Sequence, residues 1–241
     1  MNIRDEILQD LILEGVIPIS EASFFISPTV KKILNETPKV TKKAFVAQIQ
    51  KGDIIVAFSA KKQFMKTKMA KLMAKLIATA QGSPYSSAKF AIDDNVVAGY
   101  GIQVIDSPEE NEITKMNKMK FVTARSEMML IRIPDLTDEQ KTKASSFIKK
   151  RVGTKYKGSD LLKTSWNRLV NRKIFSFLKN KPVQPEAINL IQEPLFCSNL
   201  ITLALISAGY KRRFNGKHPW DTWPRDFIIS DFTSKICRIE P

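Results

Sequence analysis

The thiol of Cys197 is the side chain in this sequence that is best placed for nucleophilic chemistry. It opens the apolar run CSNLITLALIS, which predicts a helix that continues through Ala208. At the start of a helix, unsatisfied backbone N–H groups and the positive end of the helix dipole stabilise a thiolate and lower the thiol pKa. A cysteine in an apolar helix is, however, more often a small core residue. The sequence therefore leaves two interpretations of Cys197 open, a nucleophile and a core residue.

A thiol nucleophile also needs a base, and the sequence offers few candidates. An unassisted thiol is only slightly ionised near neutral pH, and the leaving group must receive a proton. The one histidine, His218, lies in the turn-rich segment NGKHPWDTW. A single histidine beside Pro and Trp is more often a surface or packing residue, so His218 is only a weak alternative for the base.

Composition excludes several classes of protein and favours anionic partners. Lys and Arg outnumber Asp and Glu by 39 to 24, which gives a net charge of +15 and favours nucleic acid, acidic lipid or an anionic cell-wall polymer as partner. Cys197 and Cys237 lie in no CxxC pattern, so we expect neither a disulfide framework nor a metal site, and no cofactor. No signal peptide and no run of about 18 apolar residues is recognisable, which favours a soluble, cytoplasmic protein.

Two basic segments could bind such a partner. Residues 61–80 predict an amphipathic helix with Met and Leu on one side and Lys68, Lys71 and Lys75 opposite, which would suit anionic lipid or nucleic acid. We favour the alternative that this helix packs its apolar side onto the rest of the domain. The later segment 211–220 mixes cations with aromatic residues, as phosphate contacts do, but its default interpretation is a solvated basic loop.

The elements that must position Cys197 are predicted from caps and apolar periodicity. Ser27–Pro28 and Thr41 are helix starts, so residues 1–50 are predicted to form a helical arm. Strands are expected at 54–58, twice within 84–101, and once or twice within 119–133, where MMLIRI is the clearest. Thr137 and Gln140 form a capping box, and the turn-rich tail ends in a strand. The sequence thus predicts an α+β fold, an antiparallel sheet packed against helices.

Several segments, in this order, resemble the circularly permuted branch of the NlpC-type papain-like cysteine hydrolases, which includes YiiX/YebB-like and lecithin:retinol acyltransferase-like proteins. The segments are KGDIIVAF, YSSAKFAIDDNVVAGYGI, MMLIRI, GTKYKGSDLL, FCSNLI and WPRDF. The resemblance covers most of residues 51–230, and its specificity comes from the order and spacing of the motifs. It implies a permuted NlpC-like domain over 51–241, after the helical arm of 1–50.

The resemblance also implies where the partners of Cys197 should lie. In the family, a histidine at the start of a strand is the general base, and the matching position here is Ser87. A third polar residue ends the next strand, and the matching position is Ala98 or Gly99. A serine hydroxyl titrates far above neutral pH and cannot cycle as acid and base. The resemblance therefore implies a hydrolase-like protein that has lost its catalytic base.

Two functions follow from these observations. In one, the protein is a cysteine hydrolase or acyltransferase that cleaves an amide or ester, with Cys197 as nucleophile and an unconventional base. In the other, the site is degenerate and the domain is a structural or binding component, possibly together with other proteins, of an assembly such as a phage or viral particle. The family occurs in bacteria, phages and large DNA viruses, so the resemblance adds a virion-associated location to the cytoplasmic one.

Overall fold

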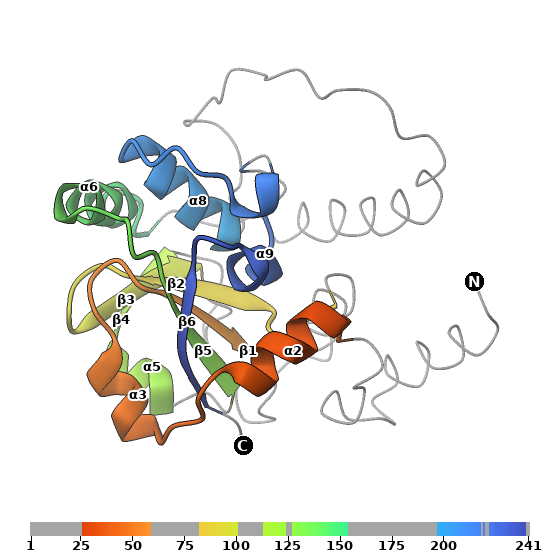
Figure 1. Ribbon diagram of the computed structural model, residues 1–241. Coiled ribbons are helices and arrows are strands. Elements are labelled where there is room, and N and C mark those ends of the chain that lie inside the picture. Colours follow the sequence, from red (N-terminus) through yellow and green to blue (C-terminus); the bar gives the residue numbers. More distant parts are fainter. Residues whose placement is uncertain are drawn as a thin grey trace, which may run out of the picture.

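The computed structural model describes residues 26–58, 82–100, 113–123, 127–153, 197–217, 219 and 222–239. Within these ranges the chain forms an antiparallel six-stranded sheet with helices on both faces (Figure 1). The α+β class predicted from the sequence is confirmed. The predicted helix at 61–80 and the first helix of the predicted arm lie outside the described residues.

The sheet places the apolar segment 54–58 at its centre. The strands are β1 (Ile54–Phe58), β2 (Ser87–Ala91), β3 (Val96–Tyr100), β4 (Ile113–Asn117), β5 (Glu127–Arg132) and β6 (Ser234–Ile239). Their order is β4-β3-β2-β1-β5-β6, and every neighbouring pair is antiparallel. Ile54 and Val56 of β1 enter one core, and Ile55 and Ala57 enter the other. Burial on both faces explains why this strand is a continuous apolar run.

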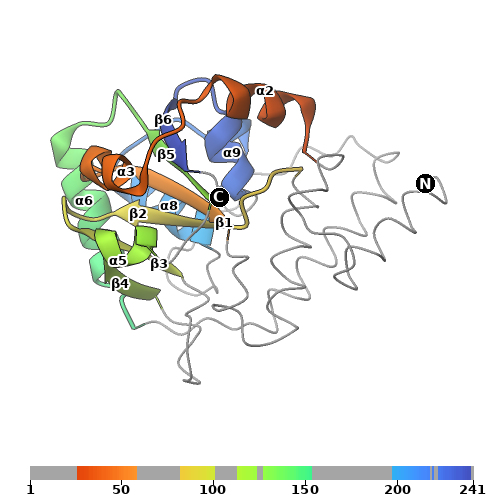
Figure 2. The same cartoon turned by 90° about the horizontal axis from the view of Figure 1, so that it is seen from below.

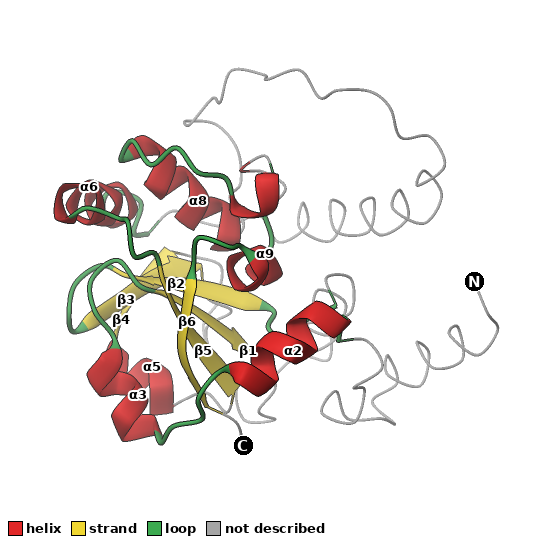
Figure 3. Ribbon diagram, in the orientation of Figure 1, coloured by secondary structure: helices red, strands yellow, loops and turns green. Residues whose placement is uncertain are grey.

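Helices form a layer on each side of the sheet (Figures 1 and 3). The described helices are α2 (Pro28–Glu36), α3 (Lys42–Gln48), α5 (Lys118–Thr123), α6 (Asp138–Lys149), α8 (Cys197–Ser207) and α9 (Pro224–Ile229), with the short 3-10 helix η3 (Phe214–Gly216). The first core lies between the sheet and α6, α8 and α9, and the second between the sheet and α3 and α5. The view from below shows α5 next to β4 (Figure 2), and α3 contacts α5.

Several helix boundaries agree with the signals in the sequence. The Ser27 side chain accepts a hydrogen bond from the Val30 N–H at the start of α2, and Thr41 does the same for α3. Thr137 and Gln140 form the predicted capping box of α6. Helix α3 lies within the predicted N-terminal arm, and its Phe45 side chain packs in the second core.

Within residues 119–133, where the sequence predicted one or two strands, the structure has one, β5. Residues 118–123 form helix α5, because the Asn117 side chain accepts hydrogen bonds from two N–H groups of the first turn. Phe121 and Val122 are then both buried, which the alternation of a half-buried strand would prevent. In the tail, residues 224–229 form α9, which begins with Pro224 at the first helical position.

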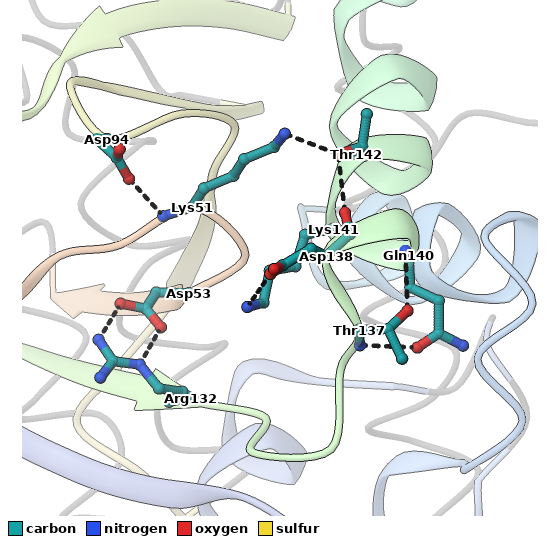
Figure 4. A network of polar contacts seen from close by, with 9 residues as sticks. All are labelled: Lys51, Asp53, Asp94, Arg132, Thr137, Asp138, Gln140, Lys141 and Thr142. Atoms are coloured by element: carbon teal, nitrogen blue, oxygen red, sulfur yellow. Dashed lines mark hydrogen bonds and ion pairs between the residues drawn. The ribbon is translucent and has the colours of Figure 1, made fainter.

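Asp53 ties the start of β1 to the end of β5 (Figure 4). Arg132 donates from Nε to Asp53 Oδ1 and from a terminal nitrogen to Oδ2, both at 2.8 Å. The Gln50 N–H also donates to Oδ2, at 2.8 Å. The Asp53 side chain is only 2% exposed, whereas that of Arg132 is 29% exposed. The KGD segment therefore serves here as an anchor of the central strand.

We expect Asp53→Asn to lower the free energy of unfolding by about 2 kcal/mol, because it removes the charge from a buried, bidentate ion pair. The measurement is chemical denaturation of both proteins. Asp138→Asn is the control, since its partner Lys141 pairs with it at the surface. Equal unfolding midpoints for all three proteins would contradict a stabilising role for the Asp53 pair.

Candidate functional site

Cys197 is the first residue of α8. This helix is apolar on nearly all sides and is buried against α6, β2 and β3. The polar residues of its first turn are buried and bonded: the Ser198 hydroxyl donates to the Thr222 carbonyl, and the Asn199 side-chain amide donates to the Pro219 carbonyl. The start of α8 is thus attached to the loop that leads into α9.

The Cys197 thiol lies in a gap between β2 and β3. These strands pair through Phe90 with Ala98 and Ala91 with Val97, and the pairing does not extend to the start of β2. The Ala91 N–H donates to the carbonyl of Asp53, the residue before β1, so by alternation the Ala88 N–H points toward the β3 side. The sulfur of Cys197 accepts a hydrogen bond from this Ala88 N–H. The thiol therefore accepts the hydrogen bond that a backbone carbonyl of β3 would accept in a continuous pairing with β2.

Burial raises the pKa of the Cys197 thiol above its ordinary value. The Ala88 N–H, the positive charge of Lys89 and the N–H groups of Ser198 and Cys197 itself act in the opposite direction, but they do not outweigh burial. The helix start has the stabilising effect on a thiolate that the sequence predicted. Desolvation is the larger effect, so the geometry favours a protonated thiol at neutral pH.

Ser87 lies one residue before the N–H that contacts the thiol. Its hydroxyl donates to the Ala57 carbonyl on β1 at 3.2 Å. By strand alternation its side chain shares a face with those of Lys89 and Ala91, while Ala88 faces the core that contains α8. The structure thus brings the backbone N–H of Ala88 to the Cys197 sulfur, whereas the Ser87 hydroxyl bonds to β1.

Gly99, a predicted position for a third polar residue, is approached by the Lys89 side chain of the neighbouring strand. The Lys89 Nζ donates to the Gly99 carbonyl at 2.8 Å and so bridges the gap between β2 and β3. A Cβ at Gly99 would lie 3.1 Å from the Lys89 side chain, and the backbone there has a φ of +152°. Ala98, the other candidate for this position, is fully buried in the first core.

Lys89 is a site residue that the sequence reasoning missed. It is only 5% exposed, and its charge lowers the pKa of Cys197. A signal was present, because Lys89 interrupts the otherwise apolar strand SAKFA in a position between two buried residues. Its ammonium group bonds to the Gly99 carbonyl, and its positive charge acts on the Cys197 thiol.

Tyr85 and Glu127 add polar groups near the start of β2. Burial raises the Tyr85 pKa, the charge of Glu127 raises it further, and the charge of Arg238 lowers it. Burial also raises the pKa of Glu127. These two groups hold their protons more strongly than usual, and neither of them contributes to the pKa shift of Cys197.

The remaining candidates lie apart from this site or outside the described residues. Cys237 on β6 lies in the second core, on the other side of the sheet from α8, and burial raises its pKa to about 11. His218 is outside the described residues, so the structure does not test it as a base. In the parts of the chain that are described, no group of three His, Cys, Asp or Glu side chains could hold a metal ion.

The basic segment that begins at 211 borders a shallow hollow of about 510 Å³. Arg212 and Arg213 line it together with residues 215–216 and 229–232, and Cys197 is not among the lining residues. Arg212 pairs with Asp135 at 3.5 Å and lies over the Phe232 ring. This arrangement agrees with a largely solvated basic loop.

Comparison with family models and with curated protein sequences finds no match to this chain. Among the described helices, none is both long and apolar enough to cross a membrane.

Proposed function

We propose that this protein is a hydrolase-like binding module without catalytic activity, in which Cys197, a partly buried residue, keeps a protonated thiol. The observation that carries the proposal is the environment of the sulfur, where burial outweighs the N–H groups and Lys89 and raises the pKa. The hydrogen bond from the Ser87 hydroxyl to the Ala57 carbonyl also supports the proposal, because this bond directs the hydroxyl to β1. The resemblance to permuted NlpC-type hydrolases motivates the comparison with an enzyme.

The resemblance and the net charge of +15 favour a place for this module in a nucleic-acid-containing assembly, such as a phage or viral particle. A catalytically silent domain in such an assembly would act through its surface. The fold then serves as a rigid support for binding residues.

A second candidate is an active cysteine hydrolase, and the observation that favours it is the buried ammonium of Lys89 beside the thiol. In this alternative Lys89 would stabilise the thiolate of Cys197, and an N–H of the helix start would bind the developing oxyanion. The two candidates differ in the protonation state of Cys197 at neutral pH.

Alkylation of each thiol by iodoacetamide across a pH series distinguishes them. Cys237→Ala leaves Cys197 as the reporter, and Cys197→Ala leaves Cys237. For Cys197 we expect the rate to rise at a higher pH in the folded chain than in the same chain unfolded in urea, because the folded-state pKa is raised. We expect Cys237 to behave in the same way, with a midpoint near its pKa of about 11.

The opposite result for Cys197, a midpoint below that of the unfolded chain, would overturn the proposal and favour the enzyme. In that case Lys89→Met, which removes the charge and keeps most of the side chain, should return the midpoint toward the unfolded value. The Cys197→Ala protein controls for slow access of the reagent to a folded core.

A further inference from the structure

The hollow of about 510 Å³ beside the basic segment has side chains of three kinds on its wall. Arg213 is a cation, Asp231 is an anion, and Phe232 offers an aromatic ring. The other lining residues are Arg212, Asn215, Gly216, Ile229 and Ser230. We call the recess formed by these eight residues the loop hollow.

Hydrogen bonds and ring contacts fix the backbone around the loop hollow. The Asn215 N–H donates to the Ser230 hydroxyl at 2.9 Å, and this hydroxyl donates to the Asp226 carbonyl at 2.6 Å. The Asn215 side chain also donates to the Asp226 carboxylate, at 3.3 Å. The Phe232 ring packs against the ring of Phe214, with 5.1 Å between the centroids, and Phe214 is buried in the first core. The wall of the loop hollow is therefore attached to the body of the domain.

Two opposite charges on this wall are not paired with each other. Arg213 and Asp231 are both exposed, and neither forms an ion pair within the part of the chain that the structure describes. Burial lowers the pKa of Lys235, and the charge of Asp231 acts in the opposite direction, but the Lys235 ammonium donates to the carbonyls of Ser230 and Thr233. A guanidinium and a carboxylate that share a hollow without pairing can bind two separate groups of one ligand.

Arg212 and Phe232 add a flat surface to the loop hollow. The Arg212 guanidinium lies 3.5 Å from the Asp135 carboxylate and 5.2 Å from the centroid of the Phe232 ring. The charge of Arg212 is thus offset by Asp135, which leaves Arg213 as the better partner for an anion. Guanidinium planes and aromatic rings both stack on flat heteroaromatic rings. The loop hollow therefore suits a ligand that combines a flat ring with an anionic group.

We propose that the loop hollow binds a nucleoside monophosphate unit. The guanidinium fork of Arg213 matches two phosphate oxygens, the Asp231 carboxylate accepts from the sugar hydroxyls, and the base stacks on Phe232. The volume of about 510 Å³ falls in the range of about 300 to 1,000 Å³ that is usual for small-molecule sites. A phosphate ion alone would use Arg213 but would face a like charge at Asp231. An amino acid would fill only part of the volume.

This inference names a ligand for the proposed binding module but does not depend on the state of Cys197. Cys197 is not among the residues that line the loop hollow. Alkylation of Cys197 and binding of a nucleotide can therefore succeed or fail separately.

The test is saturation-transfer difference NMR of the full chain, titrated with adenosine monophosphate and, separately, with adenosine. We expect adenosine monophosphate to bind at one saturable site and more tightly than adenosine. Arg213→Gln should weaken binding of adenosine monophosphate at least about tenfold and leave adenosine unaffected, because adenosine has no phosphate. Asp231→Ala should weaken binding of adenosine about threefold or more, because the sugar hydroxyls lose their acceptor.

Matched controls remove the same kinds of charge outside the loop hollow. Lys211→Gln removes an exposed cation from the same loop, and Asp138→Ala removes an exposed carboxylate from α6. We expect each control to change the affinity for either compound by about twofold or less, since only the long-range field changes. Circular dichroism and the unfolding midpoint of each variant show that loss of binding is not loss of fold.

A single-stranded adenosine trinucleotide shows whether the unit is a separate nucleotide or part of a strand. Tighter binding than that of adenosine monophosphate, with the same dependence on Arg213, supports the strand. Equal affinity supports the separate nucleotide.

Three outcomes would overturn the proposal. In the first, Lys211→Gln weakens binding of adenosine monophosphate as much as Arg213→Gln does, and the net charge of the loop explains binding. In the second, inorganic phosphate displaces adenosine monophosphate at equal concentration, and the site holds only an anion. In the third, adenosine monophosphate shows no saturable binding; if the zwitterion phenylalanine binds in its place, the ligand is an amino acid.

Discussion

Ser87→His is expected to increase the rate at which iodoacetamide alkylates Cys197 at pH 7 by about tenfold or more. The Ser87 side chain lies on the face of β2 opposite to α8, but the sulfur accepts the Ala88 N–H in the gap between β2 and β3, and the Lys89 side chain bridges this gap from the same face as Ser87. Ser87 is partly exposed, which leaves room for a larger side chain. An imidazole there can take the thiol proton and form an ion pair with the thiolate. The measurement uses the Cys237→Ala background, so that one thiol reports.

The control for this prediction is Ser146→His, which adds an imidazole at an exposed position of α6. It should leave the alkylation rate of Cys197 unchanged. If Ser87→His also leaves the rate unchanged while the protein keeps its unfolding midpoint, position 87 does not reach the sulfur. The match of Ser87 to the family's histidine would then be wrong.

Asp226→Asn is expected to lower the free energy of unfolding by about 3 kcal/mol. The Asp226 side chain is 1% exposed, and both of its oxygens accept from the Lys217 ammonium, at 2.7 and 2.8 Å. It also accepts from the Asn215 side chain and from the Trp223 N–H. An asparagine keeps the shape but leaves the half-buried ammonium of Lys217 without its counter-charge. Urea denaturation of the two proteins measures the difference.

The double variant D226N/K217M tests whether the ion pair causes this loss. Removing both charges should cost less than the sum of the single changes, because no buried ammonium remains unpaired. Strictly additive effects would contradict the ion-pair explanation. They would indicate that Asp226 acts mainly as the cap of α9, through its bond with the Trp223 N–H.

Local signals in the sequence predicted most of the described fold. The caps at Ser27, Thr41 and Thr137 and the apolar run of β1 depend on neighbouring residues only, and the structure has these elements at the predicted places. The strand β4 was missed, because ITKMN has one lysine and one asparagine among few apolar residues. β4 forms because it pairs with β3 at the edge of the sheet, and the periodicity of the sequence does not predict such a tertiary contact.

The site was predictable in part. The position of Cys197 at a helix start could be read from the sequence, because the apolar run begins there. The burial that raises its pKa could not, since it depends on how α8 meets β2 and β3. For the same reason the bridge from Lys89 to the Gly99 carbonyl was not foreseen: it forms across two strands whose separation is a property of the folded sheet. The identification of the site with the family's catalytic centre remains a prediction that the Ser87→His experiment tests.

The pairing of β6 has a consequence for the folding of this polypeptide during its synthesis on the ribosome. Residues 37–40 bond to Arg238: the Val40 N–H donates to its carbonyl, the Pro38 carbonyl accepts its N–H, and the Thr37 carbonyl accepts from its side chain. The backbone partner of this segment in β6 is therefore synthesised some two hundred residues later. Until translation reaches β6, the side of β5 that β6 covers is an open sheet edge, which favours association of the nascent chain with other chains.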